Sequence, residues 1–151
     1  MGRRQPRLRF SHKSNTRVRV IGYLDAVSGT VHSEQTSSVT ATRLAKSLSH
    51  LSHWYPQAEV IYLVWDNWPV HQHPRVQEAL QRQPQVRVIW LPTYAPWLNP
   101  IEKLWRKVKQ DTTHAHPWSD DFLEYRRQIS STFDHFTTPS PDLLRYVGLS
   151  T

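Results

Sequence analysis

Two carboxylate side chains stand where divalent-metal chemistry would need them, each beside the end of a predicted element. Asp66 directly follows VIYLVW (60–65), an apolar run that predicts a strand. Glu102 falls in the first turn of a helix predicted from Ile101. Carboxylate oxygens suit Mg²⁺ or Mn²⁺. A pair of such ions could activate water or a DNA 3′-hydroxyl for in-line displacement at a phosphodiester.

Each carboxylate also has a purely structural interpretation. An Asp-Asn pair after a strand can form an Asx-turn or cap the following helix, which would occupy Asp66. The segment Asn99 to Glu102 reads as a capping box, in which the glutamate reaches back to the Asn99 backbone N–H. Residue types and spacing alone leave both alternatives open.

The elements around these residues follow the order β-β-α-β-α-β-α-α, which predicts a mixed α/β sheet with helices packed on it. The two strands nearest the carboxylates are uniformly apolar, so we expect both to be buried and to join one sheet with an N-terminal hairpin. The helix before them should begin at Ser38 or Thr40 and continue to about Trp54. The expected strands are 16–24, 30–35, 60–65 and 86–91, and the expected helices are 40–54, 74–82, 101–112 and 119–136.

The helix that begins at Ile101 has one apolar face and one basic face. Leu104, Trp105 and Val108 continue the apolar face at helical spacing, which predicts packing on the core. Trp105, and Trp97 in the preceding loop, are expected as core or loop-anchoring residues. The cations of this helix could contact phosphates or simply face solvent, and they are Lys103, Arg106, Lys107 and Lys109.

Charge and composition narrow the class of protein. The net charge is +7, and residues 1–24 hold seven basic residues and no acidic ones. A basic arm at 1–15 could bind phosphates, with Arg3, Arg4, Arg7 and Arg9 as candidate DNA-binding residues, or it could simply be a solvated terminus. The chain has no cysteine, which excludes disulfides and thiolate metal sites. No apolar run has the length of a membrane span, so we expect a soluble, cytoplasmic protein.

Two segments carry a resemblance to a known family. DNWPVH (66–71) and LPTYAPWLNPIEKLW (91–105) resemble blocks of the DDE-superfamily transposases, specifically the bacterial insertion-sequence group related to mariner elements, the IS six-thirty family. The resemblance implies an RNase H-like mixed sheet with flanking helices. It implies Asp66 and Glu102 as catalytic metal ligands, with Asn67, His71 and Asn99 near the site. It also implies Mg²⁺ or Mn²⁺ in a two-ion site.

The resemblance further implies DNA cleavage and strand transfer in transposition of an insertion sequence. Transposon ends and target DNA would be the partners, within a homodimer associated with the bacterial nucleoid, without membrane or small-molecule cofactor. We expect one partial catalytic domain over 1–151, with 115–151 as a C-terminal helical extension. The alternative is a catalytically inactive remnant that only binds DNA through its basic arm.

The family uses three acidic ligands, and this sequence matches two of them. The first aspartate, with the first strand, is expected upstream of Met1, so the fold would be N-terminally truncated. The chain would then be the second product of a frameshifted gene or a decayed fragment. Asp25 is the other acidic candidate, although it falls at the tip of the predicted hairpin. Whether the chain is an enzyme by itself therefore stays open.

Overall fold

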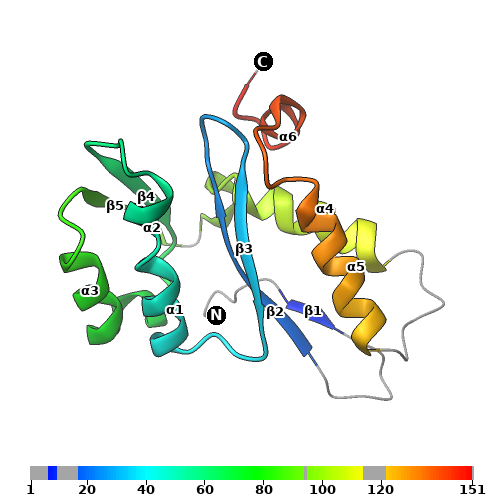
Figure 1. The fold of residues 1–151 in the computed structure, drawn as a ribbon, viewed down its shortest axis with the longest axis horizontal. Coiled ribbons are helices and arrows are strands. Elements are labelled where there is room, and N and C mark those ends of the chain that lie inside the picture. The colour runs from blue at the N-terminus through cyan, green and yellow to red at the C-terminus, as the bar shows by residue number, and fades with distance from the viewer. Residues whose placement is uncertain (1–6, 10–16, 94, 114–121, 151) are drawn as a thin grey trace. The chain divides into compact units, whose positions relative to one another are not determined.

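The computed structural model of the chain describes residues 7–9, 17–93, 95–113 and 122–150. Their contacts divide the chain into two compact units. One unit is built from Val39–Asn99, and the other combines Gln5–Ser38 with Pro100–Thr151 (Figure 1). No helix in the described ranges is long and apolar enough to cross a membrane.

The second unit contains an antiparallel sheet of three strands, β1 (Arg7–Arg9), β2 (Arg17–Leu24) and β3 (Val31–Thr36), in the order β1-β2-β3. The predicted hairpin is confirmed, with Leu24 opposite Val31 at its closed end. A glycine with φ of +80°, Gly29, closes the turn, where a residue with a Cβ would be strained. Part of the expected basic arm is thus a strand.

Three helices complete this unit: α4 (Ile101–Thr113), α5 (Phe122–Asp134) and α6 (Pro141–Tyr146) (Figure 1). The predicted apolar face of α4 is confirmed, because its side chains enter the core and Ile101 packs against it. Hairpin and helices share this core, which consists of Val18, Val20, Val31, Leu104, Trp105, Val108, Tyr125, Ile129, Phe133, Phe136, Leu143 and Val147.

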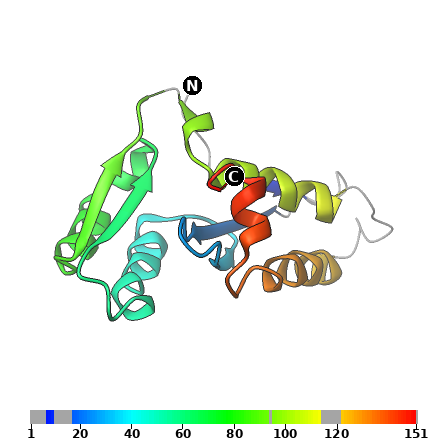
Figure 2. The ribbon, with the colours of Figure 1, turned by 90° about the horizontal axis from the view of Figure 1, so that it is seen from above.

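The first unit contains a parallel pair of strands, β4 (Ile61–Trp65) and β5 (Val86–Trp90), in register from Ile61 opposite Val86 to Trp65 opposite Trp90. The helix α3 (Pro74–Gln81) connects them, as the proline at its start predicted. The other elements of the unit are α1 (Ala41–Leu48), α2 (Leu51–Trp54), and the short 3₁₀ turns η1 (Pro69–Gln72) and η2 (Pro96–Leu98) (Figure 2).

Two expectations about the strands are wrong. Among the described residues, β4 and β5 pair only with each other, so the strands form two sheets rather than one. The pair is also not buried on both faces, because Tyr62, Val64 and Ile89 are 67%, 42% and 45% exposed. Burial alternates along β4, ending on the buried Trp65. An apolar run shows what a strand could bury, but the number of covered faces depends on packing.

The expected single helix to Trp54 is also wrong, because the structure breaks it between α1 and α2. Thr40 caps α1 as predicted, accepting a hydrogen bond from a backbone N–H of the first turn. The side chain of Gln83, which is buried, bridges the break. Its Nε2 donates to the Leu48 carbonyl at 2.8 Å, and its Oε1 accepts from the Ser52 N–H at 3.0 Å. The tertiary contact satisfies backbone groups that a continuous helix would have paired internally.

Candidate active site

Asp66 lies where β4 ends, at the carboxyl edge of the parallel pair, as the sequence predicted. The pairing continues up to its neighbour, because the Leu91 N–H donates to the Trp65 carbonyl at 2.9 Å. The Asp66 side chain is 18% exposed. The carboxyl edge of a parallel sheet is where open α/β sheets commonly bind ligands. The carboxylate is therefore partly open to solvent at an edge suited to binding.

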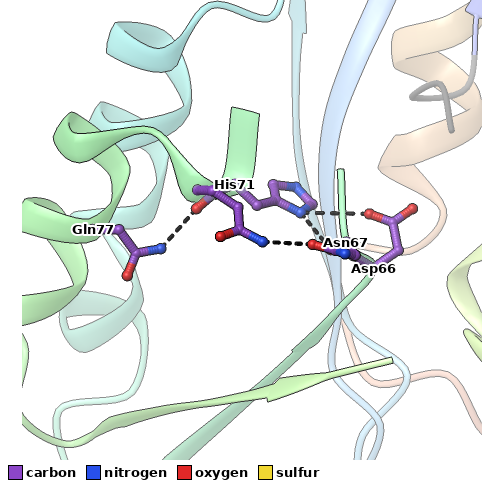
Figure 3. A network of polar contacts seen from close by, with 5 residues as sticks. Asp66, Asn67, His71 and Gln77 are labelled. Atoms are coloured by element: carbon purple, nitrogen blue, oxygen red, sulfur yellow. Dashed lines mark hydrogen bonds and ion pairs between the residues drawn. The ribbon is translucent and has the colours of Figure 1, made fainter. Parts of the chain in front are cut away.

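The imidazole of His71 faces Asp66 at two points (Figure 3). Its Nδ1 lies 2.8 Å from the Asp66 backbone carbonyl and 3.5 Å from the carboxylate Oδ1. Burial lowers the pKa of His71, while the hydrogen bond to the Asp66 backbone and the charge of its carboxylate act in the opposite direction. Because both facing oxygens only accept, Nδ1 carries a hydrogen.

Tryptophan side chains surround the His71 ring, which is 4% exposed. The ring stacks on Trp65 with centroids 4.0 Å apart and planes 5° apart. Trp68 meets it edge-on at 5.6 Å, and Trp90 lies 5.3 Å from Trp65. Sequence reasoning missed these tryptophans. Trp65 and Trp90 lie opposite each other in the register of β4 and β5, and this proximity is known only once the two strands are paired.

Two glutamine side chains brace the same loop. The Gln72 amide donates to Asn67 Oδ1 at 2.6 Å. The Gln77 amide donates to the His71 backbone carbonyl at 2.8 Å (Figure 3). The structure thus places Asn67 and His71 beside Asp66. Gln72 and Gln77 were not predicted, because a glutamine near a loop has no distinctive spacing signal.

Glu102 lies in the first turn of α4, as predicted, and its side chain is half-buried. It belongs to the second unit, whereas Asp66 and Asn99 belong to the first. Trp105, one turn further along α4, is 7% exposed and packs in the core. This contact determines how the helix packs in its unit. Convergence of Asp66 with Glu102 stays a prediction.

The cations of α4 differ in their surroundings. Lys103, Arg106 and Lys109 are exposed. Lys107 instead approaches Asp111 at 3.5 Å and the Tyr146 ring at 5.3 Å, so part of its role is to join α4 to α6. In the N-terminal segment, β1 places Arg7 and Arg9 opposite Arg19 and Arg17 on β2. Arg3 and Arg4 lie outside the described residues.

Two further expectations are resolved by the structure. Asp25 Oδ1 accepts hydrogen bonds from the backbone N–H groups of Val27 and Ser28, at 2.8 and 3.0 Å, so it stabilises the hairpin turn. Trp105 is buried as expected, but the expectation for Trp97 is wrong, because its side chain is 73% exposed. The loop turns this indole outward while the neighbouring Ala95 is buried.

Carboxylate oxygens at Asp66 and Glu102 are the donor type that a hard divalent cation requires. Within the described residues, no group of three or more histidine, aspartate or glutamate side chains could hold a metal ion. The donor chemistry therefore fits such an ion.

Comparison with known proteins agrees with this chemistry. Residues 1–122 match the family described as DDE superfamily endonuclease. The chain is 30% identical over 124 residues to the insertion element IS630 uncharacterized 39 kDa protein of Shigella sonnei. That match covers 81% of this chain and 36% of the relative, so the chain spans about a third of that protein's length.

The fold also has a solved counterpart. A chain of the cryo-EM structure of the simian T-cell lymphotropic virus intasome in complex with PP2A regulatory subunit B56 gamma matches with a TM-score of 0.62 and 20% identity. The match covers 79% of this chain and 42% of that one. The fold is accordingly RNase H-like and mixed α/β, as the sequence predicted. DDE superfamily endonucleases depend on divalent metal ions and act on DNA, and this chain belongs to that superfamily.

Proposed function

We propose that the chain is catalytic-domain sequence of an insertion-sequence transposase, which cleaves DNA and transfers the cut strand. The observation that carries the proposal is Asp66 at the carboxyl edge of β4 and β5, held by His71, in a chain matching the DDE superfamily endonuclease family. Transposon ends and target DNA would be the substrates.

Asp66 and Glu102 would hold Mg²⁺ or Mn²⁺, and the ions would activate the attacking oxygen and stabilise the leaving one. The exposed cations Lys103, Arg106 and Lys109 would bind phosphates and position the DNA without reading its sequence. Action on two transposon ends supports assembly as a homodimer, in the bacterial cytoplasm on nucleoid DNA.

A second candidate is DNA binding without cleavage. One observation favours it: four arginines oppose one another along β1 and β2. Phosphate binding needs only the cations, whereas cleavage needs the complete ligand set. The two candidates therefore differ in their dependence on Asp66 and Glu102.

Nicking of supercoiled plasmid by the 151-residue chain in Mg²⁺ separates the candidates. We expect slow, metal-dependent nicking that falls by about 100-fold or more in Asp66→Asn and Glu102→Gln. Glu59→Gln, at an exposed glutamate, is the matched control and should nick like the parent.

Nicking unchanged in both site variants would overturn the proposal. Absence of nicking, with salt-sensitive plasmid binding that survives both substitutions, would instead establish the DNA-binding candidate.

A further inference from the structure

We infer that His71 is a positioning residue for Asp66: its Nδ1–H holds the Asp66 backbone and directs the carboxylate, while the Trp65 ring fixes the imidazole. The part of this inference that concerns metal binding rests on the proposed function. The part that concerns the geometry of Asp66 does not.

The first step is the direction of the hydrogen bond. Nδ1 faces two oxygens of one residue, the Asp66 carbonyl at 2.8 Å and its Oδ1 at 3.5 Å. A carbonyl and an ionised carboxylate both accept only, so this nitrogen must carry a hydrogen. One imidazole N–H thus spans the main chain and the side chain of the same aspartate, which limits rotation of that side chain.

The second step is the fixing of the imidazole itself. A ring that could turn about its own side-chain torsions would not restrict its partner. Trp65 lies parallel to it at 4.0 Å, and Trp68 closes one edge at 5.6 Å. Stacking of this kind contributes beyond simple burial of area. Because Trp65 is the last residue of β4, stacking on it fixes the imidazole relative to the end of the strand that Asp66 follows.

The third step is the anchoring of the backbone that carries His71. The Gln77 amide donates to the His71 carbonyl at 2.8 Å, which connects the residue to α3 (Figure 3). The turn from Asp66 to His71 is therefore held at both ends, by the ring at one and by α3 at the other. A carboxylate held in this way is set before any ligand arrives, which spares the ordering cost of binding.

Two substitutions of His71 distinguish the effect of its hydrogen-bond donor from the effect of its aromatic ring. The amide nitrogen of His71→Asn takes approximately the place of Nδ1 and can still donate to the Asp66 carbonyl, whereas the amide of His71→Gln extends to the place of Nε2. Both lose the stack on Trp65, and they differ by one methylene. A difference between them therefore reports the position of the donor rather than loss of the aromatic ring.

The tautomer can be measured directly, without metal or DNA. Long-range ¹H–¹⁵N correlation spectra of the full chain at pH 7 should show the form of His71 that carries a hydrogen on Nδ1. In Asp66→Asn that form should persist, because the backbone carbonyl remains the main acceptor. An Nε2–H form in the parent chain would overturn the inference.

Mn²⁺ binding tests the consequence for the site, measured by electron paramagnetic resonance on the same chain. We expect the dissociation constant to rise about 10- to 100-fold in His71→Gln and to recover substantially in His71→Asn, since groups that orient a metal ligand have effects of that size. Gln81→Ala, at an exposed glutamine at the end of α3, is the control and should bind nearly as the parent does.

Equal loss in the Asn and Gln variants would overturn the positioning role and leave His71 as a packing residue. Mn²⁺ binding that Asp66→Asn does not weaken would refute the proposed metal site instead. In that case the tautomer spectrum still decides the positioning inference, so the two failures are distinguishable.

Discussion

Gly22 on β2 lies directly against the indole of Trp105 on α4, so closely that a Cβ atom at position 22 would overlap the benzene part of the ring. Because Gly22 has no side chain, α4 can pack closely on its backbone through Trp105. Trp105 is one turn beyond Glu102, and residues three apart share a side of a helix. The contact therefore fixes the rotation of the turn that carries the carboxylate.

Gly22→Ala should lower the free energy of unfolding by about 1–3 kcal/mol, because the added methyl group would clash with the Trp105 ring. Urea denaturation measures the change. Ser33→Ala, directly opposite on β3 and exposed, is the matched control and should be nearly neutral. Adding Trp105→Phe should make the loss less than additive, and strict additivity would show that the two sites do not interact.

Gln83→Ala should destabilise the chain by about 1–3 kcal/mol, because the Leu48 carbonyl and the Ser52 N–H would lose a buried partner. Gln83→Leu should lose a similar amount, since it restores volume without the hydrogen bonds. Thermal denaturation reports both. Gln81→Ala, at an exposed glutamine two residues earlier, should leave the midpoint unchanged. Stability retained in the leucine variant would assign the role of Gln83 to packing.

Tyr125 should make the fold sensitive to alkali. Burial raises the pKa of its phenol to about 12, whereas an unfolded tyrosine titrates near 10. Between these values the unfolded state releases the proton first, so stability falls as pH rises, by up to roughly 1.4 kcal/mol per pH unit. Tyr125→Phe should remove this part of the slope in urea denaturation between pH 9 and pH 12, probed at about half-unit steps. An unchanged slope would contradict the burial of the ionisable group.

The cations of α4 should contribute unequally to DNA affinity. Lys103→Ala and Arg106→Ala should each weaken binding to any duplex sequence and reduce the salt slope by about one, as expected for loss of one phosphate contact. Lys107→Ala should change the slope less, because that side chain is engaged with Asp111 and Tyr146. Fluorescence anisotropy across a salt series measures all three. Equal slopes for the three variants would show that the helix cations act only as a diffuse charge.

Local pattern was sufficient for the placement of the two carboxylates. An apolar run that stops at Asp66 predicts the end of a strand, and the apolar spacing from Ile101 to Val108 predicts the buried face of α4; both hold in the structure. These features depend on residues close together in the chain, so a sequence displays them directly. The blocks at 66–71 and 91–105 likewise pointed to the family that the comparisons show.

Tertiary structure decided the features that depend on distant residues. Gln83 breaks the helix expected to run to Trp54 by supplying hydrogen bonds from 31 residues away. The exposure of Tyr62 and Val64 on one face of β4 depends on where the helices pack. His71 gained its role beside Asp66 from stacking on Trp65, itself next to Trp90 across the parallel register. The sequence determined which side chains could act, and long-range packing decided which atoms face one another, because such contacts leave no periodic trace along the chain.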